Sequence, residues 1–255
     1  MAVQTLERRG RRAGLDTLRG VTVLSMIAYH ACWDLVYLFG ADWPWYHGTG
    51  AYIWQQSICW TFILLSGYCW SMGRHQLRRG LLAFGGGLLV TAVTLLIMPE
   101  DRIFCGVLTL LGSAALLMIP LEKHLRGVPA GAGLVVSLGL FLLLRDVNSG
   151  FLGFEGIRVA ALPGWLYRNL GTACLGFPPA GFRSTDYFSL LPWLFLYLTG
   201  YFLYRTQEGR EDRPSWEPSL PVVSALGRHS LAVYLLHQPL VYVLLLGMDR
   251  LLGTA

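Results

Sequence analysis

Seven apolar runs, each about long enough to cross a lipid bilayer as a helix, constrain the fold of this chain more than any other feature. A helical crossing needs about 20 predominantly apolar residues, and backbone polar groups in lipid must be hydrogen-bonded within the helix itself. The runs therefore predict an all-α integral membrane protein, a bundle of about seven transmembrane helices. They occupy roughly residues 15–38, 51–72, 80–98, 103–121, 130–145, 187–204 and 229–249.

A shorter apolar piece, Leu162–Leu175, makes an eighth crossing possible. Pro163 and Gly164 interrupt it near its start, and Pro178 and Pro179 follow its end. Proline removes a backbone donor and breaks a helix, and the piece is shorter than a crossing requires. We interpret it as an interfacial or re-entrant helix on the outer side of the membrane.

Charged residues make up only 14% of the 255 residues, against about a quarter in a typical soluble domain. No polar stretch is long enough to fold alone, so residues 1–255 are predicted to form one membrane-embedded domain. The net charge of +5 comes almost wholly from arginine, and no soluble segment combines basic and aromatic residues in a patch. Membrane lipids are therefore the expected partners of the basic residues, and nucleic acid is excluded.

The five cysteines predict no metal site, because none forms a CxxC pair or a cluster with histidine at zinc-like spacing. Most of them lie inside apolar runs, where a free thiol behaves as a small hydrophobic side chain. A bridge between Cys105 and Cys174 on the outer side is a less favoured alternative. No metal is therefore expected in this protein.

The arginines alternate between the loops in a way that predicts the orientation of the chain. Cytoplasmic loops of membrane proteins carry an excess of lysine and arginine. Loop 39–50 carries none and loop 99–102 only one, whereas the long segment 146–186 carries basic residues and departs from the pattern. The rule places the N-terminus in the cytoplasm and the C-terminus outside. The basic segments are the N-terminal tail and loops 73–79, 122–128 and 205–228.

The first apolar run carries four ionisable residues, Asp16, Arg19, His30 and Asp34, on one side of a helix. They fall within about 60° of one another and span about 27 Å along the helix axis. Such a stripe normally faces a protein interior or a water-filled cavity, because an ionisable side chain in lipid is costly. The structural alternatives are an Asp16–Arg19 pair that anchors the helix end and a His30–Asp34 pair at i, i+4. Four residues on one stripe favour a cavity between the two membrane faces.

The last apolar run has a second polar face. Ser230, Tyr234 and His237 recur at i, i+4 and i+7, which places them on one side of a helix. Gln238 precedes Pro239, which kinks a helix or frees a backbone carbonyl within the membrane. A hydrogen bond between helices is an equal alternative for His237, and Ser230 suits a helix cap better than a nucleophile.

Three arginines before the third apolar run, Arg74, Arg78 and Arg79, are topology signals first. They are also well placed to pair with the phosphates of a coenzyme A donor, because arginine binds phosphate through charge-assisted hydrogen bonds. The sequence contains no Walker or GxGxxG phosphate loop.

Several motifs resemble those of membrane acyltransferases. Arg19 and His30 match the R-x10-H pattern of their first helix, and the whole chain is more specifically similar to bacterial proteins grouped with the catalytic domain of heparan-α-glucosaminide N-acetyltransferase. The resemblance implies transfer of an acyl group, chiefly acetyl, from cytoplasmic acyl-CoA (acetyl-CoA) across the inner membrane. The acceptor would be an amine or hydroxyl of a sugar or other cell-envelope component. The matching pieces are LDTLRG at Leu15–Gly20, YHACWDL at Tyr29–Leu35, FILLSG at Phe62–Gly67, Asp186-Tyr187-Phe188 with LLPW at Leu190–Trp193, and GRHSLAVYLLHQPL at Gly227–Leu240.

The resemblance leaves two histidines open as the reactive residue. The animal enzymes of the group share the Asp-x-x-Arg-Gly start but carry an asparagine where His30 stands, and their reactive histidine lies before the second helix. His47 is the nearest match to that histidine by its distance from Gly67. Either His30 or His47 is therefore the catalytic candidate.

The sequence thus predicts an enzyme, an acyl-CoA-dependent N- or O-acetyltransferase. Acyl-CoA would dock near Arg19 and the arginine loop, with Asp16 holding Arg19 in place. His30, oriented by Asp34, would act as general base or briefly carry the acyl group, and His237 would join it as a catalytic residue. The predicted supporting residues of the site are Ser230, Tyr234 and Gln238.

A proton-coupled transporter or permease is the alternative function. Intramembrane histidine, aspartate and arginine side chains also form proton relays. Transporters are often built from inverted repeats with paired broken helices, and the sequence shows no clear sign of either.

Overall fold

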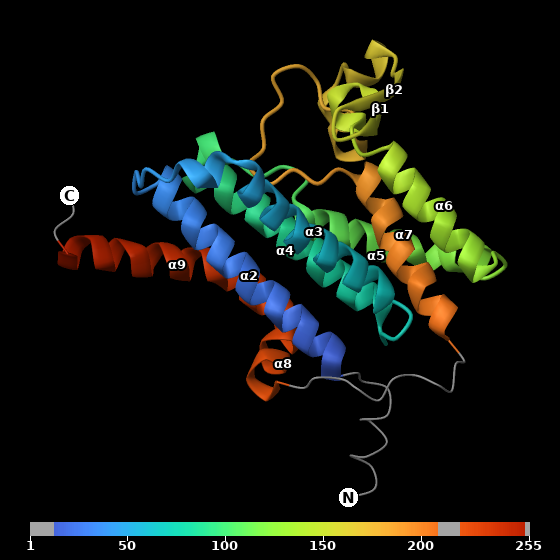
Figure 1. The fold of residues 1–255 in the computed structure, drawn as a ribbon, viewed down its shortest axis with the longest axis horizontal. Helices are drawn as coiled ribbons and strands as arrows, with labels where there is room; N and C mark the ends of the chain where they lie inside the picture. The colour runs from blue at the N-terminus through green and yellow to red at the C-terminus, as the bar shows by residue number, and fades with distance from the viewer. Residues whose placement is uncertain (1–12, 209–219, 253–255) are drawn as a thin grey trace, which may run out of the picture. The chain divides into compact units, whose positions relative to one another are not determined.

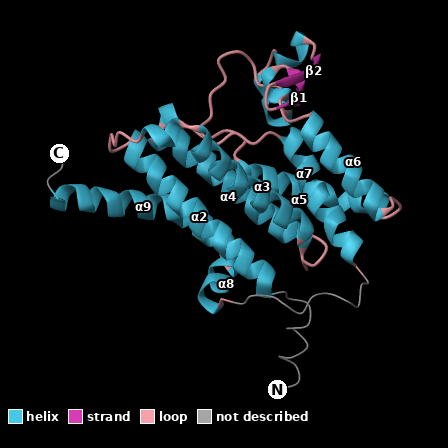
Figure 2. Cartoon of the chain, viewed as in Figure 1, coloured by secondary structure: helices cyan, strands magenta, loops and turns pink. Residues whose placement is uncertain are grey.

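The computed structural model describes residues 13–208 and 220–252. Most of them are helical, which confirms the predicted class, and each of the seven apolar runs coincides with an α-helix (Figures 1 and 2). The α-helices are α2 Ala13–Tyr37, α3 Thr49–Tyr68, α4 Gln76–Ile97, α5 Val107–Leu125, α6 Ala130–Leu143, α7 Leu190–Gln207, α8 Pro221–Arg228 and α9 Ser230–Leu252. The shorter elements are the 3-10 helices η1 Pro44–His47, η2 Pro99–Asp101, η3 Val147–Ser149, η4 Gly164–Tyr167 and η5 Leu170–Leu175, and the strands β1 Phe151–Phe154 and β2 Ile157–Ala161.

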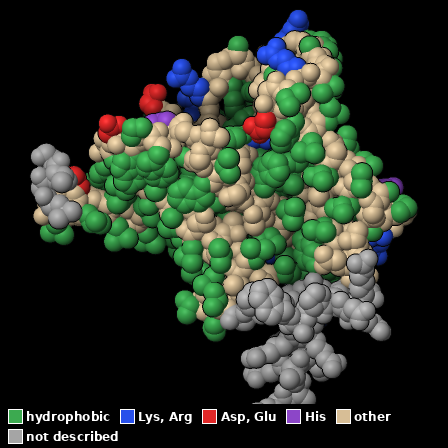
Figure 3. All heavy atoms as spheres, viewed as in Figure 1, with side chains coloured by type: hydrophobic (Ala, Val, Ile, Leu, Met, Phe, Trp, Pro, Cys, Tyr) green, Lys and Arg blue, Asp and Glu red, His purple; other side chains and the backbone are tan. Residues whose placement is uncertain are grey.

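Four of the described helical segments are long and apolar enough to cross a membrane: Gln76–Ile97, Val107–Leu125, Ala130–Ser149 and Ser230–Leu251. Large apolar side chains are exposed along α4, α6 and α9. Hydrophobic side chains also cover much of the visible surface in Figure 3, where charged side chains form only small patches. Apolar surface of this extent belongs in lipid, so the chain is an integral membrane protein.

The chain divides into two compact units. The first comprises residues 1–62 and 211–255 and holds α2, η1, most of α3, α8 and α9. The second comprises residues 63–210 and holds the end of α3, α4–α7 and the strands. The single domain over residues 1–255 stays a prediction.

In the first unit, α8 lies beside the start of α2, and α9 then crosses α2 (Figure 1). The contact between α2 and α8 needs two glycines. A β-carbon on Gly20 would lie 2.0 Å from a backbone carbonyl oxygen of α8, and one on Gly227 would lie 1.9 Å from that of Asp16. Small residues let helices approach this closely in a membrane. Beside the crossing, the hydroxyls of Thr17 and Ser224 are hydrogen-bonded at 2.7 Å.

In the second unit, α3 and α7 cross through another reciprocal pair of glycines. A β-carbon on Gly67 would lie 1.9 Å from a backbone carbonyl oxygen of α7, and one on Gly200 would lie 2.0 Å from one of α3. The Tyr68 hydroxyl donates to the side-chain oxygen of Gln207 at 2.7 Å and joins the ends of the two helices. Alongside this pair, α4 packs against α5 and α6 against α7.

A disulfide ties the start of α5 to the segment between α6 and α7. Cys105 and Cys174 are bonded, with 5.6 Å between their α-carbons, although they are 69 residues apart in sequence. The favoured interpretation of free thiols is therefore wrong for these two cysteines, because the fold brings the two loops together. Cys32, Cys59 and Cys69 are free.

Residues 162–175 were predicted to be an interfacial or re-entrant helix and not a crossing, and the prediction of one helix is wrong. This stretch forms the two short turns η4 and η5, and the Asn169 side chain accepts a hydrogen bond from the backbone N–H of Thr172 at the start of η5. Neither turn is long enough to cross a membrane. The antiparallel hairpin of β1 and β2 was not predicted either. Glu155 and Gly156 at its tip have φ of 48° and 90°, which suits a two-residue hairpin turn.

Gly67→Ala and Gly200→Ala should each lower the melting temperature in detergent micelles, followed by tryptophan fluorescence. The added methyl group meets backbone that cannot move aside, and overpacking of this kind costs about 1–3 kcal/mol. Gly139→Ala in α6 is the matched control, because nothing lies within 4 Å of its β-carbon position. Equal melting temperatures for all three variants would show that α3 and α7 do not depend on this close contact.

Candidate functional site

Four polar side chains from α2 and α9 meet inside the first unit. His30 Nδ1 lies 2.7 Å from His237 Nε2 and 3.1 Å from Gln238 Oε1. The amide nitrogen of Gln238 donates to Asp34 Oδ1 at 2.5 Å. The two imidazole ring centroids are 4.8 Å apart. His30, Asp34, His237 and Gln238 are termed the His–Gln–Asp cluster below.

Local sequence spacing brings the members of the cluster together in pairs. His30 and Asp34 are four residues apart on α2, so their side chains leave the same face one turn apart. His237 and Gln238 are neighbours on α9, which continues through the proline that follows them. The predicted direct contact between Asp34 and His30 is not present. The two side chains leave α2 one turn, about 5.4 Å, apart, and the Gln238 amide lies between them and contacts both.

The cluster is shielded from solvent, and its carboxylate is incompletely paired. Asp34 is fully buried, His237 is 5% exposed and His30 is half-buried. Asp34 Oδ1 accepts from Gln238, while Oδ2 is buried and accepts no hydrogen bond from the described residues. Such an arrangement opposes stability, and an ionisable group on a membrane helix is by default a functional candidate. Across residues 13–208 and 220–252, no three His, Cys, Asp or Glu side chains are grouped to hold a metal ion.

The predicted polar face of α9 reaches the cluster only through its middle. The backbone carbonyl oxygen of Tyr234 lies 2.6 Å from His237 Nδ1, and the two rings meet edge to face. Ser230 is the first residue of α9, about 10 Å from His237 along the helix axis. The structure therefore joins Tyr234 to the cluster and leaves Ser230 at the helix start.

The ionisable pair at the start of α2 lies well away from the cluster. Asp16 is buried, and its Oδ1 lies 3.4 Å from Arg19 Nη1. Arg19 is about 16 Å from His30 along the helix axis. The stripe predicted on α2 thus consists of two separate polar groups, one beside α8 and one beside α9.

His47, the rival histidine, has a different environment. It ends η1 and is exposed, and its Nδ1 lies 3.4 Å from the hydroxyl of Tyr37. Its ring also contacts Tyr46, which is buried and donates to the backbone carbonyl of Tyr29 at 3.3 Å. Of the two candidate histidines, His30 is the one in a buried polar network.

The three arginines predicted to bind the donor gather in the second unit. Arg74, Arg78 and Arg79 are exposed and lie in the turn before α4 and in its first turn. A helix N-terminus carries partial positive charge, so these cations do not stabilise α4 and suit an anionic partner instead. Arg79 folds back over Gly73, whose β-carbon position lies 2.0 Å from the guanidinium.

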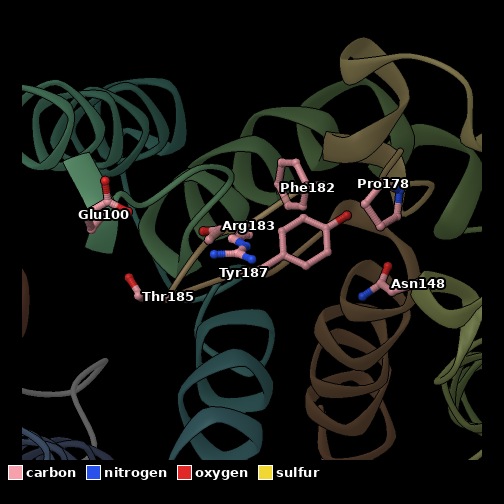
Figure 4. A pocket seen from close by; sticks show the side chains of 8 residues that line it. Glu100, Asn148, Pro178, Phe182, Arg183, Thr185 and Tyr187 are labelled. Atoms are coloured by element: carbon pink, nitrogen blue, oxygen red, sulfur yellow. The ribbon is translucent and has the colours of Figure 1, made fainter. Parts of the chain in front are cut away.

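A pocket that the sequence did not predict lies in the second unit (Figure 4). Its volume is about 470 Å³. The rings of Phe182 and Tyr187 stand in its wall with 4.9 Å between their centroids, and Glu100 and Arg183 supply opposite charges. Burial raises the pKa of Tyr187 to about 12, so its hydroxyl stays neutral and donates to the carbonyl of Ala173 at 2.5 Å. The other lining residues are Asn148, Pro178, Ser184 and Thr185.

The motif Asp186-Tyr187-Phe188 has a structural role beside this pocket. Asp186 Oδ2 accepts from the backbone N–H of Val107 at 3.0 Å, at the start of α5. The backbone N–H of Phe188 donates to the carbonyl of Cys105 at 2.8 Å. The motif therefore ties the segment before α7 to the start of α5, next to the disulfide.

Residues 11–239 match the family model described as heparan-alpha-glucosaminide N-acetyltransferase, catalytic. The match covers well over half of the chain. The chain belongs to this family. The family domain is an acetyltransferase domain with acetyl-CoA as its donor. No curated protein and no solved structure matches the chain.

Membership of the heparan-alpha-glucosaminide N-acetyltransferase family confirms the resemblance inferred from the motifs. The matched residues begin just before α2 and end one residue after Gln238. They include the whole His–Gln–Asp cluster, His47 and the arginines before α4. The cluster thus lies within the matched acetyltransferase domain.

Proposed function

We propose that this protein is a transmembrane acetyltransferase that moves an acetyl group from cytoplasmic acetyl-CoA to an amine or hydroxyl outside the cytoplasm. The acceptor is a sugar or another cell-envelope component. One observation carries the proposal: a partly buried His–Gln–Asp cluster lies on α2 and α9 of an acetyltransferase family domain. Histidine is the side chain that most often serves as a general base.

His30 is the proposed catalytic base. As the acceptor nitrogen or oxygen attacks the thioester carbonyl, His30 takes the proton of the acceptor, the C–S bond breaks and the coenzyme A thiolate leaves. The thiolate then regains the proton. In the covalent form of the mechanism, the imidazole itself attacks and carries the acetyl group before passing it on. His237 and Gln238 hold the ring of His30 in place in both cases, through contacts of 2.7 Å and 3.1 Å to Nδ1.

The donor would bind at the cytoplasmic face through arginines. Arg74, Arg78 and Arg79 would pair with the phosphates of acetyl-CoA, because guanidinium forms charge-assisted hydrogen bonds with phosphate. In the first unit, Arg19, held by Asp16 at 3.4 Å, is the donor-binding arginine on the helix that carries His30. From there the thioester would extend along α2 toward His30.

The proposed topology places seven helices, α2–α7 and α9, across the bacterial inner membrane, with the N-terminus in the cytoplasm and the C-terminus outside. The distribution of arginine supports it. The disulfide between Cys105 and Cys174 supports it as well. Disulfides persist in oxidising compartments, and this topology puts both cysteines on the outer side.

A proton-coupled transporter is the second candidate function, favoured by the hydrogen bond between His30 and His237. Two linked imidazoles within a membrane can pass a proton. Binding of acetyl-CoA separates the two functions, because a transporter of this kind has no need of a thioester donor. The purified chain should bind acetyl-CoA if it is an acetyltransferase.

His30→Ala should lower acetyl transfer at least about a hundredfold, since general-base catalysis contributes about 10²–10⁴-fold. The assay uses labelled acetyl-CoA, with glucosamine as the probe acceptor, in liposomes that contain the full chain. Acetyl-CoA binding should be unchanged. The exposed His124→Ala is the matched control. Near-normal transfer by His30→Ala, with transfer abolished in His47→Ala, would assign the chemistry to His47 instead.

The double variant Arg78→Ala, Arg79→Ala should weaken acetyl-CoA binding at least about tenfold, because two charge-assisted phosphate contacts are lost. The rate at saturating donor should change far less. Arg126→Ala is the control, since Arg126 is exposed and already pairs with Glu122 at 2.8 Å. Unchanged affinity in the double variant would reduce the arginines before α4 to topology signals.

Impermeant thiol labelling of intact cells should reach a cysteine placed at Gly48 and miss one placed at Gly73. The parent chain for this test carries serine at the three free cysteines Cys32, Cys59 and Cys69. Labelling after permeabilisation is the control and should reach both positions. The opposite pattern in intact cells would reverse the proposed topology.

A further inference from the structure

The geometry points to Gln238 as a positioning residue that fixes the tautomer of His30 and leaves His30 Nε2 as the basic nitrogen. The inference rests on the proposed function and deepens it, because it names the atom that accepts the proton. It also gives Asp34 a role that its spacing from His30 alone does not show. Four hydrogen bonds support it, together with the rule that carboxylate and carbonyl oxygens only accept.

Asp34 sets the orientation of the Gln238 amide. A carboxylate has no proton and only accepts hydrogen bonds, so the group that faces Asp34 Oδ1 at 2.5 Å must be the amide NH₂. The amide oxygen then faces His30 Nδ1, at 3.1 Å. An amide oxygen also only accepts. The proton in this contact must therefore sit on His30 Nδ1.

The contacts of His237 independently place a proton on His30 Nδ1. His237 Nδ1 lies 2.6 Å from the backbone carbonyl oxygen of Tyr234, which only accepts, so His237 carries its proton on Nδ1. A neutral imidazole has one protonated nitrogen, which leaves His237 Nε2 with a lone pair. That lone pair faces His30 Nδ1 at 2.7 Å and accepts the same proton.

The opposite tautomer of His30 is excluded by its surroundings. A lone pair on Nδ1 would face the Gln238 oxygen and the His237 Nε2 lone pair, so three acceptors would meet without a proton. With the proton on Nδ1, the lone pair of His30 is on Nε2, on the far side of the ring. His30 Nε2 is therefore the atom that takes the acceptor proton. The Nδ1–H of the resulting imidazolium still donates to Gln238 and His237.

In this role, the side chain of residue 238 must donate a hydrogen bond to residue 34 and accept one from His30. Gln238→Glu fails the first demand, because two carboxylates would meet where Gln238 now donates to Asp34. Asp34→Asn alone keeps an oxygen for the Gln238 amide. In the double variant Asp34→Asn, Gln238→Glu, the new asparagine amide donates to the new glutamate. The other oxygen of that glutamate accepts from His30.

The test measures kcat and the KM for acetyl-CoA with the full chain in liposomes, again with glucosamine as acceptor. Gln238→Glu should lower kcat at least about tenfold with little change in KM, because a buried acceptor loses its donor. Asp34→Asn should lower kcat only a few-fold. The kcat of the double variant should recover to that of Asp34→Asn. Gln207→Glu is the matched control, since Gln207 accepts from Tyr68 through an oxygen that glutamate also has.

A second comparison covers the case in which the exchanged pair fails to fold. His237→Gln keeps an acceptor near the position of Nε2, so it should retain more of kcat than His237→Leu. Equal losses in these two variants, or full kcat in folded Gln238→Glu, would overturn the inference. Absence of recovery in a folded double variant would overturn it too. If the unaltered chain transfers no acetyl group, the proposed function fails. If His30→Ala keeps transfer, His30 is not the base and this inference fails with it. If His30→Ala is inactive while Gln238→Glu is active, only this inference fails.

Discussion

The backbone contact between Gly20 on α2 and Gly227 on α8 sets the register on which the polar cluster depends. Helices in lipid gain little from burying apolar side chains against one another, so close approach of their backbones decides how they sit. The hydrogen-bonded pairs Thr17–Ser224 and His30–His237 are both separated by 207 residues, and the two glycines have the same separation. One register therefore holds along α2. A slip by one residue would turn His237 by about 100° away from His30.

That register brings a neutral side chain into the centre of the cluster. Gln238 carries no charge, so a search of the sequence for ionisable residues gives it only a supporting role beside His237. In the part of the chain that the structure describes, Gln238 links Asp34 to His30 through two hydrogen bonds. A buried network is stable only when each donor meets an acceptor, and the amide supplies one of each. The carboxylate can thus act on His30 through a group that does not ionise.

In the second unit, much of the chain outside the helices has no periodic pattern of apolar residues. Its conformation therefore depends on contacts with residues far away in the sequence. The length and hydropathy of an apolar run predict a helix, and each of the seven predicted runs overlaps one. The segment between α6 and α7 instead forms a hairpin, two short turns and a disulfide. Its conformation depends on particular partners, such as Asp186 at the start of α5 and Cys105 in the bridge. Local sequence does not reveal partners of this kind.

The sequence by itself determined the helical class, the approximate positions of seven of the α-helices, the family and the residues of the candidate site. Run length, helical spacing and motif order are properties of neighbouring residues, so they can be read along the chain. Only the tertiary structure decided that Asp34 bonds Gln238 and not His30, that His30 and not His47 joins the buried network, and that Cys105 pairs with Cys174. The bonds that decide the first, second and third of these join residues 204, 207 and 69 positions apart. Whether two such distant groups meet depends on how the helices pack, and the spacing of neighbouring residues does not predict that packing.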